Sequence, residues 1–553
     1  MMGRSTAGWL QPLVYLRQKP ILLGALLAIM AMLLYAPVAH HGFLQLDDNR
    51  YVTVNDHVRT GLSMDNVTWA FTDLGTFYWH PLTWLSHMTD CQLFGLNPGA
   101  HHLVNLALHI ANALLLFVLL KQATGSVWRS FLVATLFALH PLNVETVAWV
   151  AERKSLLSAF FSFITFGVYG WYVQRPGWKR YLAVMAAFLM ALMSKPMAVS
   201  VPLMLLLFDY WPLNRNEDAP FARRWLRLTL EKLPLFLMSA VSCGLTIVGQ
   251  RSFGAMASLS TMPVDARVQN ALTIYVAYLG KMFWPGTLAA FYPVAQPPLS
   301  WTACIASAVV LAGITALVVR FRRARYPIVG WCLFVMTLIP TIGIIQVGAV
   351  AMADRFTYIP GIGIFVIVVW ALGDAVDAFS IKPIVPAVAS LILILTCTAV
   401  TRHYLQFWKS GSALLDHARI EAVQPNRLIE EALADSLLAE GRPDEALPHF
   451  EESCQLDPSF DFCHYHIAEI QFSRHQVVEA LQEYQLALRF TTNKTIAVAC
   501  LIQSGEALLQ LGDYNAAEKQ YAFAVSLDPT NGAARRRLGQ ISAQNLSTRN
   551  PGR

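Results

Sequence analysis

Two adjacent carboxylates, Asp47 and Asp48, follow shortly after the first long apolar run of the chain. A carboxylate at a membrane surface could act as a general base that takes the proton from an incoming hydroxyl. Neighbouring aspartates are also common in turns and at helix caps, where their side chains bind the backbone. The pair alone therefore fits a catalytic site and a turn equally well, and the other ionisable residues must decide.

Several later apolar runs also end in ionisable or polar side chains. Charged groups near a membrane are energetically expensive and usually functional, although a single lysine or arginine at a loop end is normally an anchor that reaches the headgroups. The candidates are His140, Glu145, Glu152, Arg153, Lys154, Lys195, Lys281, Tyr292, Asp354 and Arg355. A topology with the basic loops in the cytoplasm puts all of them on the outer face with Asp47, so the pattern predicts one site where two acids face several cations.

A cluster of cations at headgroup height suits a lipid-phosphate donor. Cations can hold a phosphate leaving group and stabilise its growing charge while a carboxylate deprotonates the acceptor. We therefore predict glycosyl transfer from a polyprenyl phosphate, with Asp47 as the base and Asp48 orienting the acceptor or tuning that base. The residues expected to bind the donor phosphate, across a gap from the base, are Arg153, Lys154, Lys195 and Arg355. The remaining candidates for substrate contacts are His80, His140, Glu145, Glu152, Lys281, Tyr292 and Asp354.

Histidines are frequent near the same face, at His41, His80, His87, His101, His102 and His140. The adjacent His101 and His102 would point apart on a helix, and His80 and His87 lie two turns apart. We therefore expect these histidines to form hydrogen bonds rather than a metal site. The sequence has no phosphate-binding glycine loop and no Gly-x-Ser-x-Gly elbow, so we predict no metal, no cofactor, and neither soluble-nucleotide chemistry nor serine hydrolysis.

The composition assigns these residues to a membrane protein. The chain of 553 residues is 55% hydrophobic and 14% charged, whereas soluble domains are about 25% charged. Residues 403–553 carry 13 basic and 19 acidic side chains, a net charge of −6, which leaves +12 for residues 1–402 within the total of +6. The basic excess is spread over short loops, as membrane topology requires, and is not interleaved with stacking aromatics, so we predict no nucleic-acid partner.

The hydropathy pattern predicts about eleven membrane crossings. The first run, 20–38, follows three basic residues and has no cleavage site after it, which indicates an uncleaved anchor with a cytoplasmic N-terminus. The loop 40–100 then lies outside, with helices near 65–71 and 81–94. Ten further runs lie near 102–120, 129–141, 155–173, 181–194, 197–210, 233–249, 301–319, 327–346, 357–373 and 383–401.

Basic clusters between the runs set the direction of the crossings. Eleven crossings put all of these clusters in the cytoplasm, as the positive-inside rule requires. A crossing by residues 268–285 would move the arginines at 320–325 outside, so we interpret this segment as an outer interfacial or re-entrant helix ending at Trp284-Pro285. The tail, 403–553, then emerges on the same side as Asp47.

The tail is predicted to be a tetratricopeptide-repeat α-solenoid. Ala446, Ala480 and Ala517 recur at intervals of 34 and 37 residues, and an aromatic residue follows each of them four positions later. This period is typical of stacked helix pairs. The small residues expected to let the two helices of each repeat approach closely are Ala468, Gly505 and Gly539. We expect about three repeats, a half repeat at 413–425 and a cap at 531–546, with a concave surface that binds a protein; a purely structural stack is the alternative.

Two of the eight cysteines, Cys454 and Cys463, lie in the tail close enough in sequence to form a disulfide. Such a bond would persist only in an oxidising compartment. None of the eight has zinc-binding spacing, and we favour free thiols at both positions.

An ordered set of short motifs runs through nearly the whole chain: Leu46-Asp47-Asp48, Trp79-His80-Pro81-Leu82, Gly99-Ala100-His101-His102-Leu103-Val104-Asn105, His140-Pro141, Ala151-Glu152-Arg153-Lys154, Ser194-Lys195-Pro196, Asp209-Tyr210-Trp211-Pro212 and Ala353-Asp354-Arg355. In this set the chain resembles the transmembrane and tetratricopeptide-repeat containing (TMTC) O-mannosyltransferases, which are GT-C glycosyltransferases. The resemblance implies an all-α fold with a multi-pass bundle at 1–402 and a repeat domain at 403–553. It implies a mannose-like sugar on a polyprenyl phosphate as donor, a protein Ser or Thr hydroxyl as acceptor, and Asp47-Asp48 as the catalytic acidic motif.

The chain also departs from that family. Ser155 stands where relatives commonly carry an acid after the Lys154 position, and three repeats form a short array. In its small size the chain resembles a bacterial member of the family. Such a member would use undecaprenyl phosphate in the inner membrane without a metal, and its active site and repeats would lie in the periplasm. The expected enzyme is thus an inverting, metal-independent protein O-glycosyltransferase of EC class 2.4.

Two other classes of function stay open. A non-catalytic envelope scaffold would use the membrane domain as an anchor and the repeats to recruit assembly partners, so removing the tail would abolish its function while changes at Asp47 and Asp48 would not. A lipid-linked-sugar transporter would need polar groups along a path through the bilayer. The ionisable residues lie mainly at the outer ends instead, with Asp209 near the cytoplasmic end.

Overall fold

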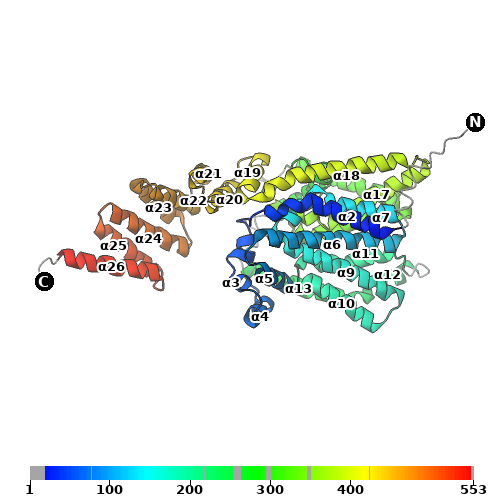
Figure 1. The fold of residues 1–553 in the computed structure, drawn as a ribbon, viewed down its shortest axis with the longest axis horizontal. Helices are drawn as coiled ribbons and strands as arrows, with labels where there is room; N and C mark the ends of the chain where they lie inside the picture. Colours follow the sequence, from blue (N-terminus) through cyan, green and yellow to red (C-terminus); the bar gives the residue numbers. More distant parts are fainter. Residues whose placement is uncertain are drawn as a thin grey trace, which may run out of the picture. The chain divides into compact units, whose positions relative to one another are not determined.

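The computed structural model describes residues 19–75, 78–215, 220–252, 263–293, 300–344, 350–422 and 424–549. The chain divides into two compact units, Met1–Ser410 and Gly411–Arg553, which we call the membrane unit and the repeat unit. Both units are built from helices, apart from one two-stranded pairing among the described residues (Figure 1). This agrees with the all-α class expected from the sequence.

Seven helical segments of the membrane unit are long and apolar enough to cross a membrane. Their helices are α2 (Pro20–Tyr35), α6 (Pro98–Thr124), α9 (Arg153–Gln174), α13 (Leu233–Ser252), α15 (Trp301–Arg320), α17 (Pro360–Ala378) and α18 (Ile384–Leu405). An eighth crossing results if α7 (Val127–Leu139) and the segment Pro141–Ala148, which includes α8 (Val144–Ala148) and meets α7 at a bend of 53°, form one span. Within the described residues, length and composition thus support seven or eight crossings and do not establish eleven.

The other three predicted crossings coincide with shorter helices. They are α10 (Trp178–Leu192), α11 (Val201–Tyr210) and α16 (Tyr326–Leu338), with 15, 10 and 13 residues. A complete crossing needs about 20 residues, so none of these helices spans a bilayer by its own length. α12 (Phe221–Glu231) precedes α13.

The segment interpreted from sequence as interfacial or re-entrant forms α14 (Val264–Phe283). It ends just before Trp284, as expected, and it is not among the candidate spans. Its buried face includes Gln269 and Asn270. Polar residues on the packed face explain why its hydropathy is lower than that of its neighbours.

Glycines allow two close helix contacts in the membrane unit. A Cβ on Gly330 of α16 would overlap the carbonyl oxygen of Gly363 of α17, and the reverse is also true. A Cβ on Gly99, at the start of α6, would overlap the carbonyl oxygen of Ala39. Small residues let membrane helices approach closely, so Gly99 holds α6 against the segment that leads from α2 into the outer loop.

The outer loop contains a π-helical turn at Asn49–Thr53, α3 (Asp56–Arg59), α4 (Met64–Thr72) and α5 (Pro81–Phe94). The last two confirm the helices predicted in this loop. Tyr51 stacks on the fully buried Trp84, with ring centroids 4.9 Å apart. An aromatic core therefore orders the loop that carries Asp47 and Asp48.

A short antiparallel pairing joins β1 (Tyr292–Pro293) to β2 (Val350–Met352). The sequence pattern did not predict these strands, which have only two and three residues. The pairing places Tyr292 beside the segment that continues from β2 into Asp354 and Arg355.

The described residues of the repeat unit form eight helices: α19 (Gly411–Glu421), α20 (Arg427–Ala439), α21 (Pro443–Leu456), α22 (Asp461–Ser473), α23 (Val477–Phe490), α24 (Lys494–Gln510), α25 (Tyr514–Leu527) and α26 (Gly532–Arg549). α20 with α21, α22 with α23, and α24 with α25 form three repeats. α19 coincides with most of the predicted half repeat and α26 with the predicted cap.

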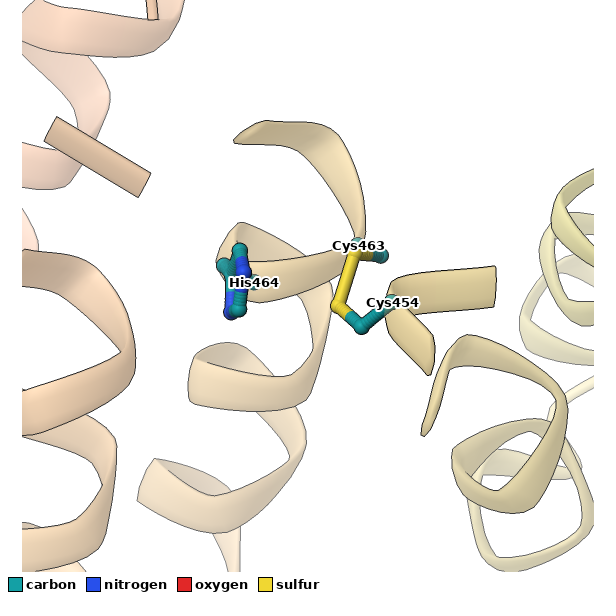
Figure 2. A group of neighbouring side chains, drawn as sticks. All are labelled: Cys454, Cys463 and His464. Atoms are coloured by element: carbon teal, nitrogen blue, oxygen red, sulfur yellow. A yellow bond between two sulfur atoms is a disulfide. The ribbon is translucent and has the colours of Figure 1, made fainter. Parts of the chain in front are cut away.

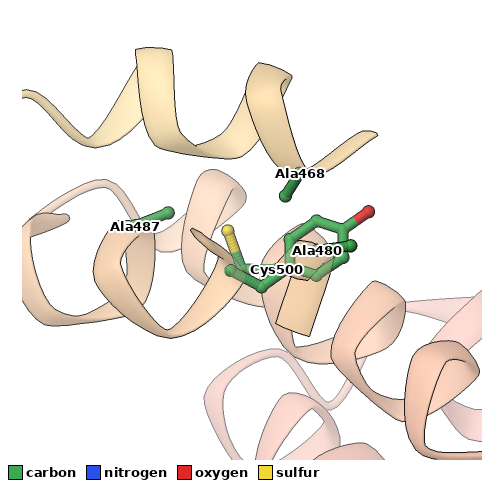
Figure 3. Packing of buried hydrophobic residues seen from close by; sticks show 5 residues of the cluster. Ala468, Ala480, Ala487 and Cys500 are labelled. Carbon is green, nitrogen blue, oxygen red and sulfur yellow. The ribbon is translucent and has the colours of Figure 1, made fainter. Parts of the chain in front are cut away.

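Small residues let the two helices of a pair approach each other closely. Ala468 and Ala480 are fully buried together with Tyr484 in one cluster of the middle repeat (Figure 3). A Cβ on Gly505 of α24 would lie 2.6 Å from the ring of Tyr521 on α25, the second helix of the same repeat. Gly539 differs, because a Cβ there would meet nothing within 4 Å. The prediction of close approach is thus wrong for Gly539, which lies on the terminal cap helix.

A disulfide joins Cys454 of α21 to Cys463 of α22, with the Cα atoms 5.8 Å apart, and Figure 2 shows this link beside His464. The expectation of free thiols at these positions is therefore wrong. The turn between consecutive repeats brings the end of one helix next to the start of another, a proximity that sequence spacing alone does not determine.

Candidate active site

Three of the predicted phosphate-binding cations surround the carboxylate of Glu152. Lys154 Nζ lies 3.2 Å and Arg355 Nε 3.4 Å from Glu152 Oε1, and Lys195 Nζ lies 3.3 Å from Oε2. Glu152 is buried. The start of α9, the loop after α10 and the segment before α17 thus converge on one carboxylate, which holds the three cations close together; we call these four residues the Glu152 cluster.

Arg355 also binds a second acid, Glu145 of α8. Its backbone N–H donates to Glu145 Oε2 at 2.8 Å, and its guanidinium pairs with Oε1. The Trp149 ring lies 5.2 Å from the guanidinium carbon. Burial disfavours the charge, but Glu145 and Glu152 raise the pKa of Arg355 above its usual range, so this side chain stays cationic.

Lys195 is buried and donates to Ser155 Oγ at 2.7 Å. Burial lowers the pKa of Lys195 to about 8, although Glu152 acts in the opposite direction. The outer loop holds the preceding residues in place, because Thr83 Oγ1 of α5 donates to the Ser194 carbonyl at 2.8 Å. Lys195 is therefore positioned by a helix far away in sequence, and its pKa is lowered to about 8.

The adjacent Asp47 and Asp48 have different surroundings. Asp48 is fully buried, and its two oxygens accept backbone N–H groups from Leu44 and Ala151, both at 2.8 Å. Burial raises the pKa of Asp48 to about 7. These bonds tie the outer loop to the residue just before Glu152, so Asp48 has a positioning geometry.

Asp47 remains accessible. Its side chain is 34% exposed, and its Oδ2 lies 3.9 Å from Lys154 Nζ. The gap expected between the base and the cations is therefore short at this point. A loose, partly solvated ion pair thus distinguishes the accessible Asp47 carboxylate from the buried Asp48 carboxylate.

The structure does not bring Arg153 to the Glu152 cluster. Its fully buried guanidinium donates to Asp90 Oδ2 at 2.8 Å, Ser86 Oγ at 2.8 Å and the His101 carbonyl at 2.9 Å, and its Nε contacts Asn105. With its donors used in this way, Arg153 braces α5 and α6 against α9.

Asp354, Tyr292 and Lys281 form a neighbouring group. The Tyr292 hydroxyl donates to the buried Asp354 carboxylate at 3.0 Å, and Lys281 Nζ lies 4.5 Å from the Tyr292 ring. Burial raises the pKa of Asp354 to about 8. Asp354 is next to Arg355 in sequence, but its carboxylate is held by Tyr292.

The two histidines proposed for substrate contacts bind backbone groups. A ring nitrogen of the buried His80 contacts the Tyr78 carbonyl. His140 Nε2 lies 3.0 Å from the carbonyl of Met282 at the end of α14, and its Nδ1 accepts from the Leu142 backbone. His140 thus ties α7 to α14.

A small open cavity of about 40 Å³ adjoins the Glu152 cluster. Its polar lining includes Lys195, Arg355 and Ser155, and its apolar lining includes Met197, Ala198, Ile359 and Pro360. Roughly three water molecules would fill that volume. The cavity therefore places two cations beside an apolar wall, which is complementary to an anionic phosphate attached to an apolar chain.

Two residues of the site were not predicted from the sequence. Ser155, noted only as a departure from a family pattern, contacts Glu152 and accepts from Lys195. Tyr51 is fully buried, and its ring lies 4.4 Å from Lys154 Nζ. The sequence signal that could have identified Tyr51 was its position three residues after Asp48, because a residue so close to the acidic pair shares the surroundings of that pair.

The fold and site define a multi-pass membrane protein with a cationic cluster and a C-terminal repeat array. A tetratricopeptide-repeat family model matches residues 431–494 and 502–545. Over 285 residues the chain is 26% identical to Protein O-mannosyl-transferase Tmtc1 of Drosophila melanogaster, covering 47% of this chain and 33% of that protein.

Two other relatives extend the similarity over most of the chain. Protein O-mannosyl-transferase Tmtc3 of Drosophila melanogaster is 22% identical, covering 73% of this chain and 51% of that protein. Human Protein O-mannosyl-transferase TMTC1 is 21% identical, covering 69% of this chain and 48% of that protein. The chain is thus TMTC-like: most of its length is similar to distant protein O-mannosyltransferases, and its C-terminal part contains tetratricopeptide repeats. It spans about a third to a half of the length of these relatives.

Proposed function

We propose that this protein transfers a mannose-like sugar from a polyprenyl-phosphate donor to a Ser or Thr hydroxyl of a protein, with inversion at the anomeric carbon. The observation that carries this proposal is the convergence of Lys154, Lys195 and Arg355 on one buried carboxylate beside a partly apolar cavity. The relatives are named as protein O-mannosyl-transferases, which supports the same class of reaction.

In this proposal the donor phosphate binds where Lys195 and Arg355 line the cavity. The bound phosphate takes over part of the charge neutralisation that Glu152 and Glu145 provide for these cations. The first isoprene units lie along Met197 and Ile359. Because these cations are already in position when the reaction begins, they stabilise the charge that develops on the leaving group without further reorganisation of the site. Lys281 and Tyr292 would contact the sugar or acceptor from the neighbouring group.

Asp47 is the proposed base. As the acceptor oxygen forms its bond to the anomeric carbon, its proton passes to the Asp47 carboxylate, and the bond from that carbon to the phosphate oxygen breaks. The electron pair leaves with the polyprenyl phosphate, whose charge the cations balance. Asp48 positions this loop through its bonds to Leu44 and Ala151.

We further propose that the site and the repeats face the same oxidising side of the membrane. The Cys454–Cys463 disulfide supports this side for the repeats, because such bonds persist in oxidising compartments. An odd number of crossings joins a cytoplasmic N-terminus to an outer tail. Eleven crossings result if α7 and Pro141–Ala148 form one span and if α10, α11 and α16 also cross with the help of their flanking residues. Reporter fusions after Arg325 and at the C-terminus test this arrangement.

The function is tested by transfer in a defined system. The purified chain in nanodiscs, given polyprenyl-phosphate mannose and an unfolded acceptor protein, should add hexose to Ser or Thr, as detected by mass spectrometry. Arg355→Ala should lower the rate, whereas Lys382→Ala, which changes an exposed lysine between α17 and α18, should not. Equal rates for these two variants would exclude the Glu152 cluster as the donor site.

A further inference from the structure

A second polar cluster lies beside the candidate active site, in the hairpin formed by α5 and α6. His87 and Asp90 are one turn apart on α5, and His101 is in the first turn of α6. Their exposed fractions are 0%, 4% and 0%. One nitrogen or carboxylate oxygen from each lies within 4.8 Å of those of the other two. Three side chains of ligand type thus meet in the interior.

His87 is the first sign that this cluster binds something. Neither of its ring nitrogens has a hydrogen-bond partner in the part of the chain that the structure describes, although both are buried. Leaving a buried polar atom unpaired costs about 1–3 kcal/mol, and such atoms are rare in folded proteins. A ligand at His87 would remove that cost.

His101 is oriented as a metal ligand. Its Nε2 lies 3.0 Å from the Gly95 carbonyl, to which it donates, so its Nδ1 has a free lone pair. Metal-binding histidines usually donate their other ring N–H to a carbonyl or carboxylate in this way. His101 Nδ1 also has no hydrogen-bond partner within the described residues, and it faces Asp90 Oδ2 at 3.6 Å.

The distance of 3.6 Å is informative. It is too long for a hydrogen bond. A tetrahedral site with bonds of about 2.0–2.2 Å has edges of about 3.3–3.6 Å between its ligand atoms. The spacing of Nδ1 and Oδ2 therefore matches two ligands that share an ion.

We propose that His87, Asp90 and His101 bind a divalent first-row transition ion, with zinc as the ion best suited to two imidazoles and a carboxylate. Arg153 donates to the same Asp90 oxygen at 2.8 Å, which leaves the site with excess positive charge. The fourth ligand is consequently hydroxide or another small anion. This site is separate from the Glu152 cluster and does not depend on the proposed function.

The ion would have a structural role. The ion joins α5 to α6 across the turn at Gly95. Arg153 lies between Glu152 and Lys154 in sequence, so it connects this second cluster to the Glu152 cluster. The loop that carries Asp47 packs on α5 through Tyr51 and Trp84. Loss of the ion should therefore loosen the outer loop and reduce the order of the site.

The test is zinc analysis of the full chain purified in detergent without reductant, so that Cys454 and Cys463 stay joined and provide no thiol ligands. After dialysis against zinc and then metal-free buffer, the wild type should retain about one zinc per chain, and a chelator should lower its melting temperature. His87→Leu should lose the zinc, melt at a lower temperature and no longer respond to the chelator. His403→Gln, which changes an exposed histidine, should behave as the wild type.

The opposite outcome is equally clear. Without a metal, His87→Leu replaces an unpaired buried imidazole with an apolar side chain, which should leave stability unchanged or raise it. A wild type that retains no zinc, or a His87→Leu variant that retains as much as the wild type, would overturn the proposal.

Discussion

Replacement of Asp47 by asparagine separates a catalytic carboxylate from a structural one. Asn keeps the size and removes the basicity. Removal of a general base lowers rates by about 10²–10⁴-fold, which corresponds to about 3–5 kcal/mol in the activation free energy. Because the phosphate-binding cations are unchanged, we expect this loss in kcat, with KM for the donor nearly constant.

The same variant should fold normally. The Asp47 side chain is 34% exposed, and its ion pair with Lys154 is 3.9 Å long. Exposed pairs contribute about 0–1 kcal/mol to stability, so the melting temperature should change by about 2 °C or less. Asp48→Asn should lose both stability and activity. The carboxylate of Asp48 accepts hydrogen bonds from two backbone N–H groups, and the amide NH2 of asparagine would face one of these donors.

The assay is steady-state transfer of labelled mannose from polyprenyl phosphate at varied donor concentration, with the melting temperature measured on the same samples. Asp56→Asn is the matched control, since Asp56 lies in the same loop with its side chain 86% exposed. If Asp47→Asn transfers sugar within about threefold of the wild-type rate while the control is normal, the base assignment and the expected effect are refuted.

Three further outcomes follow from the geometry. The transfer rate should fall above about pH 8, because burial lowers the pKa of Lys195 to about 8 and its ammonium charge is then lost. Lys195→Arg should keep the rate constant to higher pH, and a pH–rate profile identical to that of the wild type would contradict the role of Lys195 in binding the phosphate. Glu152→Gln leaves buried cations uncompensated and should cost about 3–5 kcal/mol of stability, with the melting temperature partly restored by inorganic phosphate; no phosphate effect would argue against an anion site. Gly505→Ala should destabilise the repeat unit by about 1–3 kcal/mol through overlap with Tyr521, measured by limited proteolysis of the full chain, whereas Gly539→Ala should not.

Local patterns were sufficient for the class of the protein. The apolar runs predicted a multi-pass membrane protein because a bilayer core has no partners for bare backbone groups, so each crossing must be a continuous apolar helix. The spacing of Ala446, Ala480 and Ala517 predicted the paired helices of the repeat unit, since each repeat packs mainly on its sequence neighbours. Hydropathy was less informative about the crossing count, because short helices such as α11 and α16 have apolar sequences without the length of a span.

The sequence by itself determined the class of the protein, its repeat period, and the set of cations and acids from which a site could be built. Only the tertiary structure decided which of them meet. Arg153 and Lys154 are adjacent and were given the same role, yet successive helical residues point about 100° apart, so one faces Asp90 and the other Glu152. Likewise, the contact of Arg355 with Glu152 and the closure of the Cys454–Cys463 disulfide depend on distances between helices, which the packing of the whole unit sets and no local sequence pattern encodes.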